Sequence, residues 1–258
     1  MSGKVLRYAK YGSGRPLIIL HGLLGSGDNW QSQAKHLARG YAVYTPDLRN
    51  HGSSFHDEEM SYPAMAEDVR RLMHADTIER PFVMGHSMGG KTAMELALRY
   101  PKDVEALVVV DIAPFPYKPI YGNLFSALEH VDVESITGRK DAEEQLKPYV
   151  SDRMVRLFLL KNLRRTDEGG FAWRVNLESL SRHYNEIWAG LEGNRVFEGP
   201  VLFVEGEKSR AEITERWDEI KEYFPRAENV VIPRAGHWVH AEKPREFLRI
   251  VTGFLDSL

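Results

Sequence analysis

The 258-residue chain carries 34 Lys and Arg residues against 37 Asp and Glu residues, giving a formal net charge of −3, and 43% of its residues are hydrophobic. This near-neutral balance is typical of a soluble globular protein and argues against a dedicated nucleic-acid binder, which is usually basic. The chain contains no cysteine, which excludes disulfides, a thiolate nucleophile and cysteine-ligated metal centres. Covalent chemistry would therefore depend on Ser, Thr, Lys, Asp or Glu.

The chain shows neither of the apolar segments that direct proteins to or through membranes. Its first residues lack the apolar run of a signal peptide. The most apolar stretches, such as residues 107–116, are too short to span a bilayer, and this one contains Asp111. We therefore expect a cytoplasmic protein without a membrane span.

The N-terminal half alternates short apolar runs with helical patterns. Continuous apolar runs predict buried strands at residues 16–21, 41–45, 81–85 and 104–112. Apolar spacing and end signals predict helices at residues 28–39 (with Asp28 as the N-cap), 62–75 and 88–100. Such strands, separated by helices, are typical of a parallel sheet covered on both faces.

Residues 113–199 interrupt this alternation, because they hold helical patterns but no convincing strand. The alternation then resumes, with predicted strands at residues 200–205 and 230–232 and predicted helices at residues 212–224 and 244–255. We predict an α/β core formed by residues 1–112 and 200–258, with residues 113–199 inserted as a helical lid. In such sheets, functional sites lie beyond the carboxyl ends of the strands.

One segment of the predicted lid, residues 153–165, is apolar over most of a helical circumference and has a basic face. Four cations share one arc of that helix: Arg153, Arg156, Lys161 and Arg164. A solvated basic face over a packed helix is the ordinary interpretation. The alternative is a cationic rim for a phosphate-bearing or otherwise anionic substrate.

The sequence Gly85-His-Ser-Met-Gly89 matches G-x-S-x-G and lies between a predicted strand and a predicted helix. A sharp turn in this context exposes the hydroxyl of Ser87, and the flanking glycines remove side chains that would clash there. The N-terminus of the following helix favours negative charge at the same place. Ser87 is the candidate nucleophile.

A serine hydroxyl needs a base at neutral pH, and the chain has ten histidines. His237 is favoured because it follows the last predicted strand, in Ala235-Gly-His-Trp238, at the same edge of the sheet as Ser87. His240 is the nearest rival, and we expect it to point away from the site or to pack against the chain. His86 adjoins Ser87 but would leave the turn in another direction.

A third group must orient the histidine. Asp111 is favoured because it ends a very apolar strand, where a carboxylate needs a charged or hydrogen-bonded partner. Glu205 and Glu207 are the alternatives after another strand, and Glu178 of the predicted lid is a more distant one. The backbone N–H groups of Met88, which follows the nucleophile, and of Leu23, after the first core strand, are expected to form the oxyanion hole.

Two polar segments at this edge are given structural roles. His21 is expected to hold the turn at Gly22 through bonds to nearby backbone. The run Asp47-Leu-Arg-Asn-His51-Gly-Ser-Ser54 is followed by His56, Asp57 and Glu58, which gives it the composition of a metal site. Its spacing matches no metal signature, so we expect loop hydrogen bonding around Gly52 and no bound metal.

Together these residues resemble the α/β-hydrolase superfamily. Four motifs stand in family order and spacing: His21-Gly, the run from Asp47 to Ser54, Gly85-His-Ser-Met-Gly-Gly90 and Gly236-His-Trp. Four longer runs look more narrowly like the YbfF-type esterases: residues 85–91, Val110-Asp-Ile-Ala-Pro114, Trp173-Arg-Val-Asn-Leu177 and residues 236–244. The chain departs from the commonest superfamily pattern at Ser209, where most members carry the acid, which leaves the third group open between Asp111 and the glutamates.

The resemblance implies a serine carboxylesterase that hydrolyses short- to medium-chain acyl esters, without a metal or organic cofactor. A nucleophilic serine argues against the dehalogenase and epoxide hydrolase branches. Acyl-CoA thioester hydrolysis is the main alternative, supported by the basic arc. Carbon–carbon bond hydrolysis and perhydrolysis stay open. A non-catalytic ligand receptor on the same fold is less favoured, because such proteins often lose the nucleophile or the base.

Overall fold

A computed structural model describes residues 4–118 and 122–258. Its centre is a sheet of seven strands in the order β1-β3-β2-β4-β5-β8-β9, in which all neighbours are parallel except β1 and β3. The strands are β1 (Tyr8–Tyr11), β2 (Arg15–Leu20), β3 (Tyr41–Pro46), β4 (Phe82–His86), β5 (Ala106–Val110), β8 (Val201–Gly206) and β9 (Ala227–Ile232). The predicted mostly parallel sheet is confirmed.

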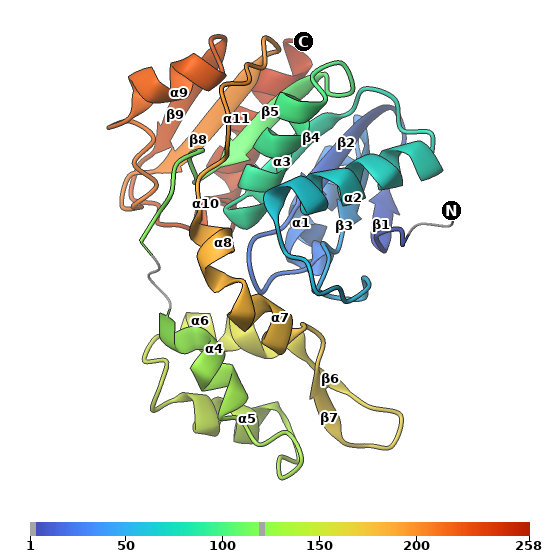
Figure 1. The fold of residues 1–258 in the computed structure, drawn as a ribbon, viewed down its shortest axis with the longest axis vertical. Helices are drawn as coiled ribbons and strands as arrows, with labels where there is room; N and C mark the ends of the chain where they lie inside the picture. The colour runs from blue at the N-terminus through green and yellow to red at the C-terminus, as the bar shows by residue number, and fades with distance from the viewer. Residues whose placement is uncertain (1–3, 119–121) are drawn as a thin grey trace.

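Helices cover both faces of this sheet (Figure 1). They are α1 (Gln31–Leu37), α2 (Tyr62–Ala75), α3 (Met88–Arg99), α9 (Trp217–Tyr223) and α11 (Pro244–Asp256). In β2, Ile18 and Leu20 pack into the core that includes α2 and α3, while Leu17 and Ile19 pack into the core that includes α1 and α11. Because both faces are buried, the strand needs a continuous apolar run.

The chain between β5 and β8 forms a separate layer below the sheet in Figure 1. This layer, which we call the inserted segment, contains α4 (Gly122–Glu129), α5 (Arg139–Leu146), α6 (Arg153–Leu159), η2 (Leu160–Asn162), β6 (Leu163–Arg165), β7 (Phe171–Trp173), α7 (Leu177–Arg182) and α8 (Tyr184–Trp188). The chain enters and leaves this segment through two stems that run side by side, residues 113–117 and 188–191. Tyr117 N–H donates to Trp188 O at 2.9 Å, and Leu191 N–H donates to Pro114 O at 2.7 Å. The expectation that residues 113–199 contain no strand is wrong, because β6 and β7 form a short antiparallel hairpin.

Some predicted boundaries also change. Asp28 is not an N-cap, because Ser26 caps a short 3-10 helix, η1 (Gly27–Trp30), which precedes α1. The helix predicted to begin at residue 212 begins at Trp217, since Glu212 has a left-handed φ of 53°. Strand β1 and the short helix α10 (Val239–Glu242) were not predicted. No helix among residues 4–118 and 122–258 is long and apolar enough to cross a membrane.

The loop after β3 is fixed to α2 by a buried ion pair. The guanidinium of Arg49 contacts both carboxylate oxygens of Asp68, at 2.5 Å and 3.0 Å. The two side chains are 4% and 0% exposed. Two parallel hydrogen bonds between buried charges set the position of this loop firmly, and the loop lies beside the carboxyl end of β2.

We predict that Asp68→Asn lowers the free energy of unfolding by about 3–5 kcal/mol, because the buried charge of Arg49 loses its nearer counterion and keeps only the more distant carboxylate of Asp57, at 3.8 Å. Asp103→Asn is the matched control, since the Arg70–Asp103 pair has the same chemistry but is about one-third exposed, and its loss should cost less than about 1 kcal/mol. Urea unfolding measures both. Equal losses for the two variants would contradict the structural role given to Asp68.

Candidate active site

Ser87 lies in the sharp turn between β4 and α3, with φ 53° and ψ −121°. Its N–H donates to Val110 O at 3.1 Å, which ties the turn to the neighbouring strand. A Cβ on Gly85 would lie 2.1 Å from Gly89 O, and one on Gly89 would lie 2.5 Å from Leu20 O. Only glycine fits at either position, so the predicted strand–turn–helix context of Ser87 is present.

His237 and Asp111 meet at the same edge of the sheet, although 126 residues separate them. His237 Nδ1 lies 2.7 Å from Asp111 Oδ2. The carboxylate is fully buried and also accepts from Gly206 N–H at 2.8 Å and from the Ser209 hydroxyl at 2.5 Å. A carboxylate accepts from Nδ1–H, so in the neutral ring Nε2 is the nitrogen that can accept a proton.

The alternative acids have other partners. The Glu205 carboxylate accepts from the N–H groups of Ile213 and Thr214 at 3.0 Å and 3.1 Å. Glu207 accepts from Arg234 N–H at 2.7 Å, and Glu178 pairs with Arg182 on the exposed surface of α7. The geometry therefore favours Asp111 over Glu205, Glu207 and Glu178.

The two rival histidines have other partners. His86 Nε2–H donates to His237 O at 2.8 Å. His240 stacks on Trp30 with ring centroids 4.1 Å apart, so it packs against the chain as expected. Burial lowers the pKa of His240 to about 3 and that of His86 well below its usual value. Both rings are therefore neutral near pH 7.

The loop after β2 lies against the nucleophile. A Cβ on Gly22 would lie 3.3 Å from Ser87 Cβ, and Gly25 N–H donates to Gly22 O at 3.0 Å to close a tight turn. Within the described ranges, no acceptor is paired with the N–H of Leu23 or of Met88. Both groups are thus available to a ligand at Ser87.

The histidines His21 and His51 hold the loops around this turn. His21 Nε2 accepts from Leu48 N–H at 2.9 Å and its Nδ1 donates to Gly22 O. His51 Nε2 accepts from Leu24 N–H at 3.1 Å. A Cβ on Gly52, which has φ +56°, would lie 2.2 Å from the Asp47 carboxylate. These bonds match the structural role expected for the loop. Among the described residues, no group of three or more His, Cys, Asp or Glu residues is arranged to hold a metal ion.

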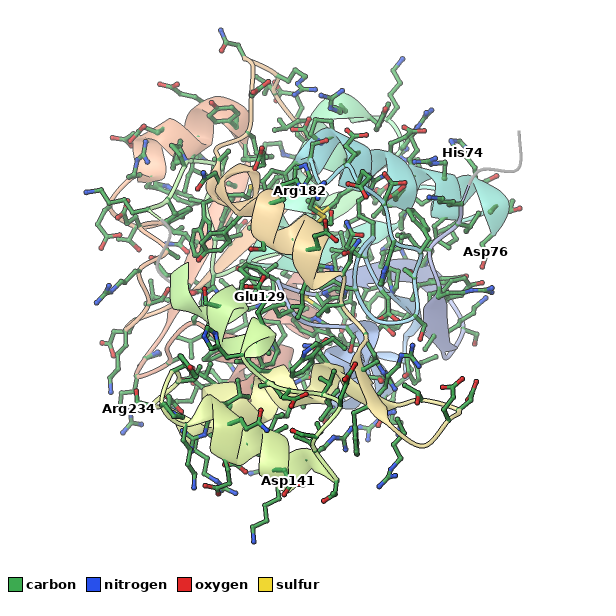
Figure 2. All side chains as sticks on the ribbon, turned by 60° about the horizontal axis from the view of Figure 1, so that its bottom comes forward. His74, Asp76, Glu129, Asp141, Arg182 and Arg234 are labelled. Atoms are coloured by element: carbon green, nitrogen blue, oxygen red, sulfur yellow. The ribbon has the colours of Figure 1, made fainter. Side chains whose placement is uncertain are left out.

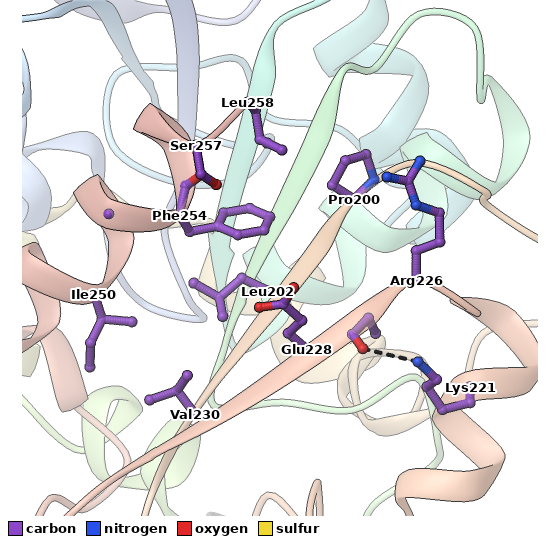
Figure 3. Close-up of a pocket in the computed structure, with 12 residues that line it drawn as sticks. Pro200, Leu202, Lys221, Arg226, Glu228, Val230, Ile250, Phe254, Ser257 and Leu258 are labelled. Atoms are coloured by element: carbon purple, nitrogen blue, oxygen red, sulfur yellow. Dashed lines mark hydrogen bonds between the residues drawn. The ribbon is translucent and has the colours of Figure 1, made fainter.

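Ser87, His237, Leu23 and Met88 line one cavity of about 680 Å³ between the sheet and the inserted segment. Its wall is mostly apolar and includes Leu24, Ile112, Leu124, Val155, Phe158, Ile187 and Trp188. A second hollow, of about 630 Å³, lies where β8 and β9 begin and is lined by residues such as Leu202, Lys221 and Phe254 (Figure 3). It contains none of the predicted site residues, in keeping with sites beyond the carboxyl ends of strands.

Lys91, one turn after Ser87 on α3, is buried and lines the cavity. Its ammonium donates to Phe115 O at 2.8 Å and to Ala189 O at 2.5 Å, one on each stem of the inserted segment. Burial lowers the pKa of Lys91 to about 7. In the sequence, Lys91 stands out only as the last residue of the run 85–91. No local pattern indicates that its side chain contacts both stems of the inserted segment.

The predicted basic arc is wrong. Helix α6 ends at Leu159, and the chain continues as η2 and strand β6, so the four cations do not share one helical face. Arg156 turns inward and donates to Val150 O at 2.8 Å, while Lys161 alone among the four lines the cavity. The exposed charges of the segment, such as Glu129 and Arg182, lie on its outer surface (Figure 2).

Comparison with known proteins identifies the family. The family model described as the alpha/beta hydrolase fold matches residues 15–244. The chain belongs to the α/β-hydrolase family. The expected resemblance to YbfF is confirmed, since Esterase YbfF of Escherichia coli is 35% identical over 243 residues, covering 94% of this chain and 93% of that protein.

Other similar proteins are named as lipases or esterases. The sn-1-specific diacylglycerol lipase ABHD11 of Xenopus laevis is 45% identical over 252 residues, covering 95% of this chain and 80% of that protein. A solved structure named as a marine microorganism esterase superposes with a TM-score of 0.95 at 40% identity, covering 98% of this chain and all of that one.

The buried histidines predict how stability depends on pH. Burial lowers the pKa of His21 to about 4 and that of His51 to about 3 in the folded protein, from an ordinary value of 6.5. Below pH 6.5 the unfolded chain therefore binds more protons, so stability is lost as the pH falls from 6.5 toward 4. Unfolding midpoints in urea should fall across this window.

His51→Gln should reduce the slope of that fall, because it removes one titrating ring while keeping an acceptor for Leu24 N–H. His36→Gln, at an exposed position, is the control and should leave the slope unchanged. If His51→Gln and His36→Gln both lose stability with pH as steeply as the unmodified protein, the contribution assigned to the buried His51 ring is contradicted.

Proposed function

We propose that this hydrolase is a serine carboxylesterase that cleaves short- to medium-chain acyl esters through an acyl-enzyme at Ser87. The single observation that carries the proposal is that Ser87 and His237 meet at one cavity, with the buried Asp111 hydrogen-bonded to the His237 ring. The strained turn presents Ser87, His237 lines the same cavity, and the Asp111 carboxylate accepts from the His237 ring at 2.7 Å. The esterase and lipase names of the relatives support an ester as the substrate.

In the proposed mechanism His237 Nε2 takes the proton of Ser87 as the hydroxyl oxygen attacks the ester carbonyl carbon. Asp111 keeps the Nδ1 proton in place and stabilises the imidazolium that forms. The tetrahedral intermediate collapses when His237 protonates the leaving alcohol oxygen. The same nitrogen then takes a proton from a water molecule as the water oxygen attacks the acyl carbon. This second tetrahedral intermediate collapses when His237 returns the proton to the Ser87 oxygen, which breaks the bond to the acyl group and releases the acid.

The N–H groups of Leu23 and Met88 are proposed to stabilise the oxyanion of both tetrahedral intermediates. They flank Ser87 from the loop after β2 and from the first turn of α3. Removing one such donor costs about 3–4 kcal/mol of transition-state stabilisation in serine hydrolases. Backbone donors need no reorganisation during the reaction, so the stabilisation that they give the oxyanion depends on their position before the substrate binds.

We propose that residues 113–199 act as a lid over this site. Phe158 and Trp188 give its cavity wall an apolar character suited to an acyl chain. The thioester alternative loses its main support, because Arg156 binds backbone and the predicted basic arc does not exist. The receptor alternative is disfavoured because it would leave the His237–Asp111 hydrogen bond beside Ser87 without a use.

Ser87→Ala should lower the hydrolysis of p-nitrophenyl acetate by about 10⁴-fold or more, since the nucleophile of a serine hydrolase is removed. The fold should persist, because the backbone and not the hydroxyl fixes the turn. Steady-state rates and labelling by a fluorophosphonate probe measure the loss. Hydrolysis that continues in the variant, or an unmodified protein that does not label, would overturn the proposal.

Asp111→Asn should lower kcat by about 10⁴-fold while the protein stays folded, because the amide no longer holds the productive tautomer of His237. Asparagine tolerates the left-handed φ of 55° at this position. Glu207→Gln tests the alternative acid and should leave kcat within about twofold, since its carboxylate accepts from Arg234 N–H and not from the His237 ring. The reverse ranking would transfer the acid role to Glu207.

A further inference from the structure

The turn that carries Leu23 is strained. Residues 22–25 are closed by Gly25 N–H to Gly22 O, and the third residue of the turn, Leu24, has a left-handed φ of 58°. A turn with φ > 0 at this position favours glycine or asparagine, and a leucine there stores strain. Such a conformation persists only where neighbouring groups hold it.

Two side chains hold the backbone of Leu24, one on each side of the residue. His51 Nε2 accepts from its N–H at 3.1 Å, and the side-chain amide of Asn162 donates to its carbonyl oxygen at 2.7 Å. A carbonyl oxygen is only an acceptor, so the Nδ2 end of Asn162 must face it. His51 belongs to the core, whereas Asn162 belongs to the inserted segment, 138 residues further along the chain.

Asn162 is itself firmly placed. The residue is 3% exposed, and its backbone carbonyl oxygen accepts from Arg174 N–H at 2.8 Å, which joins it to the end of β7. It closes η2, directly after helix α6, whose Val155 and Phe158 line the cavity. The hydrogen bond to Leu24 therefore links the wall of the cavity to the loop beside Ser87.

We infer that Asn162 is a positioning residue for the oxyanion hole, because its hydrogen bond to Leu24 O keeps the strained turn in the conformation that presents Leu23 N–H to the reacting carbonyl. This inference rests on the function proposed for Ser87 and Leu23. The inserted segment thus contributes to the chemical step as well as to the cavity wall. Without the bond, the turn relaxes and Leu23 N–H loses its direction toward the site.

A merely structural role for Asn162 would be to fasten the inserted segment to the core, and another residue serves as the control for it. Ser179 of α7 is also buried, and its hydroxyl donates to Asp57 O at 3.0 Å and accepts from Asn50 Nδ2 at 3.3 Å. It joins the same two parts of the protein but does not line the cavity. Ser179→Ala removes both of these bonds between the core and the inserted segment, at a residue outside the cavity wall.

The experiment compares Asn162→Leu, Asn162→Asp and Ser179→Ala in the full chain. Leucine removes the donor with little change in volume, and aspartate keeps the shape but, in its ionised form, offers only acceptors to Leu24 O. For each variant, kcat and KM are measured on p-nitrophenyl acetate, and the inhibition constant is measured for a phenyl trifluoromethyl ketone. That ketone forms a hemiketal with Ser87 whose oxyanion occupies the same hole. Thermal unfolding is recorded alongside.

Both Asn162 variants should lower kcat by about tenfold, the worth of one positioning hydrogen bond, with KM within about twofold. They should weaken ketone inhibition by about the same factor, because the hemiketal oxyanion uses the same donors. Ser179→Ala should leave kcat and ketone inhibition within about twofold, whatever it does to the unfolding temperature.

Asn162 variants that change kcat and ketone inhibition no more than Ser179→Ala does, or that raise only KM, would overturn the inference. The Ser87→Ala protein, assayed in parallel, separates this failure from a failure of the proposed function. If Ser87 is dispensable, the proposed function is wrong. If Ser87 is essential and the Asn162 variants behave like the control, only the positioning role is wrong.

Discussion

The candidate site depends on how the carboxylate of Asp111 is satisfied. This group is fully buried and is held by three hydrogen-bond donors, the Gly206 N–H, the Ser209 hydroxyl and the ring of His237. A buried carboxylate is costly without partners, so the loops after β8 and β9 are drawn to the end of β5. Parallel pairing of β5, β8 and β9 makes this possible, since it brings three carboxyl ends to one edge.

The same edge collects backbone strain. Leu24, Ser87 and Asp111 follow β2, β4 and β5, and each has a positive φ although none is glycine. Residues in this conformation cluster at functional sites, where the surrounding structure holds them. His51 and Asn162 hold Leu24. The N–H of Ser87 is held by Val110 O of β5, and the N–H of Asp111 is held by Val204 O of β8.

Local sequence patterns predict those features of the candidate site that are set by neighbouring residues in the chain. The G-x-S-x-G motif marks a turn in which only glycine fits beside Ser87, and an apolar strand that ends in Asp111 indicates a carboxylate in need of a partner. The sheet was predictable for a similar reason, because strands buried on both faces, such as β2, leave continuous apolar runs.

The inserted segment was harder to predict, because its contacts are set by tertiary packing. The basic arc failed because helical periodicity was extended beyond Leu159, where the chain turns into η2 and β6. Nothing near Asn162 indicates that its amide meets Leu24 O, since the two residues are 138 positions apart. The sequence shows Ser209 only as the position where most family members carry the acid, yet its hydroxyl donates to the carboxylate of Asp111, the acid proposed instead.

The most direct test of the central claim is to trap the covalent intermediate and locate it. The protein is mixed with p-nitrophenyl butyrate, quenched in acid during the first turnover, digested and examined by mass spectrometry. The account predicts a butyryl group on the peptide that contains Ser87, and no such adduct when His237 is replaced by alanine. A butyryl group on another residue, or turnover without any acylated peptide, would contradict it.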